Sequence, residues 1–186
     1  VDNNGGTALM YAAAGGDGVS SLLADRWPAL LREIVGGGVD VNAVRNGGRA
    51  ALMIASTEEA TSSTIPSLLE LGADTSLRDN QGRTALLSAC AEGNRPDVIA
   101  LAKKSNVNAL DLEGNSALML LAYKAEAVAA VKALIAAGAD ANAANFGGRT
   151  VLMCASDGGS SDVVSAVLAA DAKVNARDNL GRTALM

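Results

Sequence analysis

The chain has 186 residues, of which 49% are hydrophobic and 19% charged, and its formal net charge is −5. This composition excludes a disordered chain, which is poor in apolar residues and high in net charge. The charge also argues against nucleic-acid binding, because the densest basic run is only Lys103-Lys104.

The same composition predicts neither a membrane protein nor a secreted one. The longest apolar stretch, around residues 125–139, is interrupted by Glu126 and Lys132. The sequence begins with no signal-peptide pattern and has no Asn-x-Ser/Thr sequon. We therefore expect a cytoplasmic location, with the nucleus as an alternative. Since the first residue is not Met, we also expect a segment of a longer protein.

One short phrase recurs six times along the chain. A glycine and a variable residue are followed by Thr, Ser or Ala, by Ala or Val, and by Leu-Met or Leu-Leu. The leading glycines are separated by 43, 34, 32, 34 and 33 residues. They are Gly5, Gly48, Gly82, Gly114, Gly148 and Gly181. A period of this length is typical of stacked repeats that bury their apolar faces against one another.

Each phrase predicts the start of a first helix. Its hydroxyl residue is a good N-cap, able to accept a hydrogen bond from a free amide of the first turn. These residues are Thr7, Thr84, Ser116, Thr150 and Thr183. The second copy has Ala50 instead, so the start of its first helix is predicted to be less stable. Glycines or polar residues at 15–16, 93–94 and 158–159 are expected to end the first helices.

A second helix is predicted in each complete copy. Apolar residues recur there at three- and four-residue spacing, over residues 30–35, 65–71, 98–102, 128–135 and 163–168. Gly38, Gly72 and Gly138 follow at positions where a left-handed residue would end the helix. Turn residues such as Asp79-Asn80-Gln81-Gly82 then lead to the next phrase.

The first copy is about ten residues longer than the others, near residues 17–28. This insert contains Leu22, Leu23 and Trp27, the only tryptophan. An insertion in a repeat can form a functional loop. We favour a structural interpretation, in which these residues extend and cover the second helix and Pro28 occupies its first turn.

The Gly-x-Thr-Ala-Leu-Met and Gly-Ala-Asp-x-Asn-Ala phrases resemble the ankyrin repeat over essentially the whole chain. The resemblance implies an all-α repeat solenoid of helix-turn-helix units with hairpin turns, elongated and curved. We expect one domain over residues 1–186, with repeats one to five at 2–44, 45–78, 79–110, 111–144 and 145–177 and a partial repeat six at 178–186. The family's usual Thr-Pro-Leu-His reads Thr-Ala-Leu-Met here, and the chain has no His. Packing of Met or Leu must replace the imidazole contacts.

The sequence offers no catalytic or metal-binding set. Without His it lacks the commonest general base and metal ligand. Cys90 and Cys154 lie two repeats apart, which is too far for a disulfide and makes a poor zinc site. The glycine clusters at 15–18 and 36–38 lack the context of a phosphate-binding loop. We therefore expect a protein that is not an enzyme and binds no cofactor and no metal.

The resemblance implies that a partner protein binds the concave face, which is formed by the turn tips and the first helices. Leu112 and Phe146 occupy the same tip position in adjacent repeats, and they either form an apolar binding patch or pack on neighbouring hairpins. Tyr123 is the best single candidate on the first helices. The predicted partner-binding residues are Arg45, Asn46, Arg78, Asn80, Gln81, Asp111, Leu112, Glu113, Asn145 and Phe146 at the tips, and Tyr11, Ile54, Leu120 and Tyr123 on the first helices.

The main functional hypothesis is a monomeric protein-interaction scaffold that binds no nucleic acid and no membrane. An alternative is a small-molecule-sensing or regulatory module of a larger enzyme, for which Arg45, Arg78 and Tyr11 are the only candidate ligand contacts. A third possibility is a spacer within a longer chain.

Overall fold

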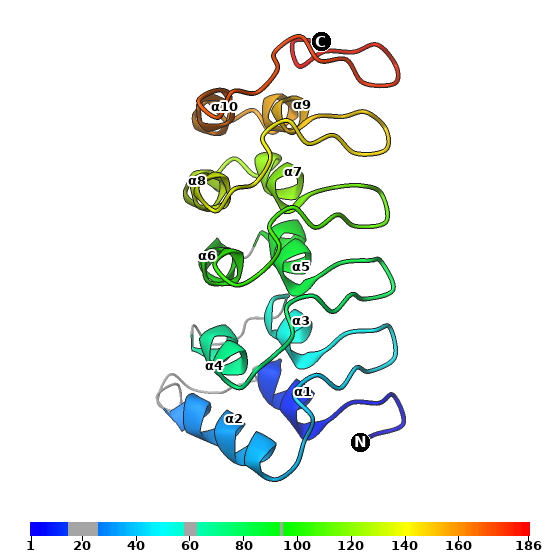
Figure 1. Cartoon of the computed structure of the whole chain (residues 1–186), viewed down its shortest axis with the longest axis vertical. Helices are drawn as coiled ribbons and strands as arrows, with labels where there is room; N and C mark the ends of the chain where they lie inside the picture. The colour runs from blue at the N-terminus through cyan, green and yellow to red at the C-terminus, as the bar shows by residue number, and fades with distance from the viewer. Residues whose placement is uncertain (15–25, 58–62, 94) are drawn as a thin grey trace.

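The computed structural model describes residues 1–14, 26–57, 63–93 and 95–186. The helices in this part form two parallel rows with hairpins along one side (Figure 1). The inner row, next to the hairpins, contains α1 (Ala8–Ala13), α3 (Ala51–Ala55), α5 (Ala85–Glu92), α7 (Ala117–Ala122) and α9 (Val151–Asp157). The outer row contains α2 (Trp27–Gly36), α4 (Thr64–Glu70), α6 (Arg95–Ala102), α8 (Val128–Ala136) and α10 (Ser161–Leu168).

Each helix packs against the next helix of its own row and against its partner in the other row. In the inner row α5 contacts α3 and α7, and in the outer row α6 contacts α4 and α8. Within the described residues, extended pairing is limited to isolated bridges such as Val44 with Ala50. The predicted all-α repeat solenoid is confirmed.

Hydroxyl side chains cap the inner helices as predicted. The Oγ1 of Thr7 accepts from the amide of Met10 at 3.3 Å, and the Oγ of Ser116 accepts from the amide of Met119 at 3.3 Å. Thr84 and Thr150 make the same contact. Ala50 provides no such cap, and α3 is the shortest helix of the described part, with five residues. The three residues after Thr183 form only a turn, because they are too few for a helical hydrogen-bond ladder.

The outer helices lie at the predicted positions. Gly38, Gly72 and Gly138 follow α2, α4 and α8 with φ of +90°, +85° and +90°, a conformation that favours glycine. Trp27 begins α2, where Pro28 occupies the first turn, and the Trp27 ring is buried. The ring is therefore part of the core, whereas Leu22 and Leu23 lie outside the described residues.

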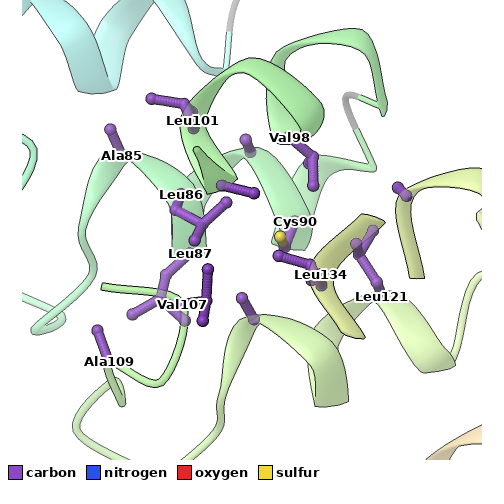
Figure 2. Close-up of a cluster of buried hydrophobic side chains, with 14 of the residues drawn as sticks. Ala85, Leu86, Leu87, Cys90, Val98, Leu101, Val107, Ala109, Leu121 and Leu134 are labelled. Carbon is purple, nitrogen blue, oxygen red and sulfur yellow. The ribbon is translucent and has the colours of Figure 1, made fainter. Parts of the chain in front are cut away.

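The core runs the length of the stack between the two rows. Figure 2 shows its middle, where Leu86 and Cys90 of α5 lie among apolar side chains from α6, α7 and α8. The residues at the family's His position are buried in all five complete repeats. They are Met10, Met53, Leu87, Met119 and Met153. Apolar packing thus fills the place of the absent imidazoles.

The hairpins are linked from repeat to repeat by backbone hydrogen bonds. The amide of Asn46 donates to Asn4 O at 2.8 Å, and that of Asn80 donates to Gly47 O at 3.0 Å. The amides of Leu112, Phe146 and Asn179 continue the series, each bonding to the preceding tip. These bonds hold the tips in a regular row, which is visible along one edge of Figure 1.

Candidate protein-binding surface

Leu112 and Phe146 are the most prominent apolar side chains of the predicted tip residues. Leu112 is 67% exposed and Phe146 is 71% exposed. Each also covers a glycine of the preceding repeat, Leu112 at Gly82 and Phe146 at Gly114, where an added Cβ would lie within about 3 Å of the neighbouring side chain. The two interpretations of the sequence therefore hold together: these side chains pack on the preceding hairpin and still present apolar area to solvent.

The polar tip residues divide into exposed and structural ones. Asn46, Asn80, Gln81 and Glu113 are exposed. Together with Leu112 and Phe146 they form what we call the hairpin-tip surface.

Asp111 and Asn145 hold the turns instead. Asp111 is buried, and its Oδ1 accepts from the amides of Glu113 at 2.9 Å and Asn115 at 2.8 Å. The Oδ1 of Asn145 makes the same pair of bonds, to Gly147 and Arg149 at 3.0 Å each. Because its carboxylate is occupied by the turn, we leave Asp111 out of the predicted surface.

The two arginines of the alternative hypothesis are placed differently from each other. Arg78 links two hairpins, because its Nη1 donates to Gly82 O at 2.5 Å and to Leu110 O at 2.6 Å. Arg45 is half-buried in the hairpin of repeat two. Tyr11, the third candidate, donates its hydroxyl to the carboxylate of Asp2. This hydrogen bond raises the pKa of Tyr11 and lowers the pKa of Asp2.

The predicted inner-helix positions differ in exposure along the row. Tyr11 is 62% exposed and Tyr123 is 42% exposed, whereas Leu120 is half-buried. Ile54 is 1% exposed on α3, which lies between α1 and α5. A partner cannot reach Ile54 in this arrangement, so we leave it out of the predicted surface as well.

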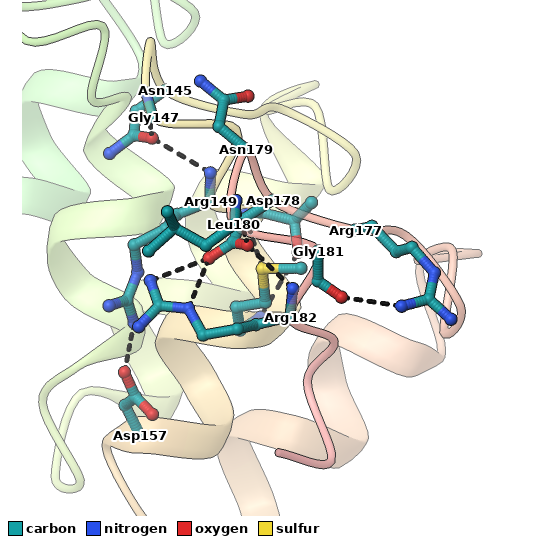
Figure 3. Close-up of polar contacts among 12 residues, drawn as sticks. Asn145, Gly147, Arg149, Asp157, Arg177, Asp178, Asn179, Leu180, Gly181 and Arg182 are labelled. Carbon is teal, nitrogen blue, oxygen red and sulfur yellow. Dashed lines mark hydrogen bonds and ion pairs between the residues drawn. The ribbon is translucent and has the colours of Figure 1, made fainter.

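Tyr123 lies in a polar cluster between repeats four and five. The guanidinium carbon of Arg149 lies 5.5 Å from the centre of the Tyr123 ring, and Arg149 also forms an ion pair with Asp157 (Figure 3 shows the pair). Burial, followed by a hydrogen bond with Cys154, raises the pKa of Tyr123 to about 12. The cluster therefore holds a neutral phenol beside a cation at neutral pH.

A row of arginines on the same side of the molecule was not predicted from the sequence. The residue after the leading glycine is Arg in four of the six copies, and we call this set the arginine row: Arg49, Arg83, Arg149 and Arg182. Arg149 and Arg182 form ion pairs with Asp157 and Asp178 (Figure 3). The repetition of Gly-Arg was a signal for this row, but in the sequence it is inseparable from the capping phrase that follows it.

Within the described residues the structure offers no group of three or more His, Cys, Asp or Glu side chains that could hold a metal ion. Burial raises the pKa of both cysteine thiols, which are unpaired. They therefore behave as small buried core residues rather than as nucleophiles. Among the described helices, none is long and apolar enough to cross a membrane.

The sequence model of the family "Ankyrin repeats (3 copies)" matches residues 24–111, 52–145 and 118–186. A curated protein from Caenorhabditis elegans, the intracellular phospholipase A2, is 33% identical over 112 residues. That match covers 55% of this chain and 10% of the phospholipase, so the chain spans about a tenth of this relative's length. The family match extends over most of the sequence and agrees with the paired helices and linked hairpins of the structure. The chain belongs to the ankyrin repeat family.

Proposed function

We propose that this domain binds a partner protein through the hairpin-tip surface and the adjoining inner helices. The observation that carries the proposal is the exposure of Leu112 and Phe146 on adjacent tips whose backbones are fixed by hydrogen bonds. An apolar side chain that is already held in place loses little conformational entropy when a partner covers it. Aromatic anchors of this kind often dominate the binding free energy of an interface.

The family supports this assignment, since ankyrin repeats are generally protein-interaction modules. We propose that the domain acts by binding and not by catalysis, because its thiols are buried and the sequence has no His. The two free thiols are compatible with the cytoplasmic location that we also propose. We further propose that the domain is monomeric.

A photo-crosslinking amino acid at position 146 tests the proposal directly. We expect it to capture a partner in cells, whereas the same amino acid at Ile99, which is 37% exposed on the outer helix α6, should not capture that partner. Equal capture from both positions would contradict the proposed surface.

Truncating the apolar tips gives the first quantitative prediction. Phe146→Ala and Leu112→Ala should each weaken partner binding by roughly tenfold or more, as expected for central apolar anchors. Ile99→Ala serves as the matched control and should leave the affinity unchanged. Binding of the captured partner can be measured by calorimetry, and unchanged affinity in both tip variants would count against the surface.

A regulatory module within a longer enzyme is the second candidate function. It is favoured by the match to a tenth of the intracellular phospholipase A2, which is named as an enzyme and is much longer than this domain. In this case the hairpin-tip surface would contact another part of the same polypeptide. Crosslinks from position 146 would then join segments of one chain rather than two proteins.

A further inference from the structure

The hairpin-tip surface adjoins a polar pocket that lies between repeats two and three. The pocket has a volume of about 330 Å³, and its wall includes Arg49, Ser88, Glu92 and both Asp79 and Arg83 of the third hairpin. We call it the arginine pocket. It is distinct from the Arg149 and Arg182 end of the row, where each guanidinium has a carboxylate partner.

Within the part of the chain that the structure describes, no carboxylate forms an ion pair with Arg49 or Arg83. Among those residues the guanidinium of Arg49 donates to two neutral acceptors, Met53 O at 3.4 Å and the hydroxyl of Thr57. The guanidinium of Arg83 has no hydrogen bond or ion pair to any described residue, and its Nε is buried without an acceptor. A buried donor without a partner is costly, so an acceptor that enters the pocket and pairs with Arg83 gains binding free energy.

The two carboxylates of the pocket do not fill this role. The Oδ1 of Asp79 accepts from the amides of Gln81 and Arg83 at 2.9 Å each, which ties it to the turn. Glu92 is exposed at the end of α5 and forms no ion pair with any side chain that the structure describes. Glu92 instead opposes the entry of another anion, which makes it useful in a test.

An apolar contact lies next to the arginine pocket. Arg83 and Gln81 also line a second pocket of about 190 Å³, whose wall includes Leu112 and the carboxylates Asp111 and Glu113. A ligand that reaches Arg83 therefore lies close to the exposed side chain of Leu112, and Phe146 follows on the next tip. The surface places two arginines beside an apolar contact.

Resting on the proposed function, we infer that the partner contributes an extended segment that pairs an acidic side chain with a nearby apolar one. The carboxylate enters the arginine pocket between Arg49 and Arg83, and the apolar side chain covers Leu112 and Phe146. The formal net charge of the chain is −5, which disfavours non-specific binding of acidic segments elsewhere on the domain.

The test begins with a random peptide library displayed on phage and selected against the intact chain. We expect enrichment of peptides that carry Asp or Glu within a few residues of Leu, Ile or Phe. The best peptide and its form with Gln in place of the acidic residue are then titrated by fluorescence anisotropy. The acidic form should bind Arg83→Gln roughly tenfold more weakly than it binds the unchanged chain.

Two further variants make the result specific. Glu92→Gln should strengthen binding of the acidic peptide and leave the Gln peptide unaffected. Arg32→Gln removes the same charge from α2 of the outer row, where Arg32 pairs with Glu70 over 2.9 Å, and should change neither affinity. Circular dichroism of each variant confirms that the fold is kept.

The inference is overturned if no selected peptide loses affinity with Arg83→Gln, or if Arg32→Gln has an equal effect. It is also overturned if Gln peptides bind as well as acidic ones. If such peptides still lose affinity with Phe146→Ala, the proposed function stands and only the acidic specificity fails. If photo-crosslinking at position 146 captures no partner, the proposed function fails instead.

Discussion

The groups around the Tyr123 phenol set its pKa. Burial and the thiol of Cys154 favour the neutral form of the phenol, while the nearby Arg149 favours the phenolate. The net result is a pKa of about 12, above the ordinary value of 10.0 for a tyrosine. Because the pKa is higher in the folded state than in the unfolded state, Tyr123 stabilises the fold below pH 10. This contribution is lost as the pH rises from about 10 to about 12.

A titration of phenolate absorbance tests whether folding raises the pKa of Tyr123. In the Tyr11→Phe variant Tyr123 is the only tyrosine, and we expect it to ionise near pH 12 in the folded protein and near pH 10 in concentrated urea. Across that pH range, the free energy of unfolding measured in urea should decrease more in the unchanged chain than in Tyr123→Phe. A Tyr123 that titrates alike in both solvents would show that the packing around its ring is absent.

At the level of the element, α3 is the exception among the inner helices. The other inner helices begin at a Thr or Ser whose oxygen accepts from an amide of the first turn. Ala50 leaves that amide of α3 without a side-chain acceptor. Ala50 and Ser116 are both 2% exposed, so the position accommodates a hydroxyl without loss of packing.

Ala50→Ser should therefore stabilise the domain by about 1 kcal/mol, the usual contribution of an N-cap. Ser116→Ala is the matched change in the opposite direction and should destabilise the domain by about the same amount. Urea unfolding followed by circular dichroism measures both. A loss of stability in Ala50→Ser would mean that the capping geometry seen at Ser116 does not form at α3.

Neighbouring repeats are also joined by asparagine side chains. Asn108 donates through Nδ2 to Gly138 O at 3.0 Å and accepts from the amide of Asp140 at 2.9 Å. Asn42 and Asn142 make the equivalent pair of bonds across their own boundaries. At the same position repeat two has Ser76, whose bonds to the described residues go to Asp74 of its own repeat.

Asn108→Ala should weaken the boundary between repeats three and four by about 1 kcal/mol, since both bonds are exposed and each contributes modestly. Asn175→Ala is the control, because the side chain of Asn175 bonds to no following repeat among the described residues. Hydrogen exchange of the amides in α7 and α8 should increase in Asn108→Ala only. Equal effects of the two changes would show that the bridge does not couple the repeats.

For the whole molecule, stability comes from contacts between successive repeats, because each helix packs mainly on its neighbours in the stack. The hairpin backbones follow the same rule, since each tip bonds to the one before it. These bonds hold the tips of the hairpin-tip surface in a regular series over several repeats. A long partner segment can therefore contact several repeats at once without reordering the domain.

Much of the hairpin-tip surface followed from position within the repeat, but not all of the predicted residues lie on it. The exposure of Leu112 and Phe146 was predicted because turn tips point away from the core. Ile54 was misplaced because it occupies the same helical position as the exposed Tyr11. Tyr11 lies in the first repeat, whereas α3 has an inner helix packed on both sides.

The sequence by itself determined the repeat, its helices and their caps. These depend on local hydrogen bonds and on apolar spacing within about 33 residues, which the residue order states directly. Only the tertiary structure decided that Asp111 and Ile54 are buried, and that Arg49 and Arg83 of different repeats line one pocket without an ion pair to any described carboxylate. Those facts depend on how successive repeats stack, because burial and pairing at each position are set by side chains about 30 residues away in the sequence.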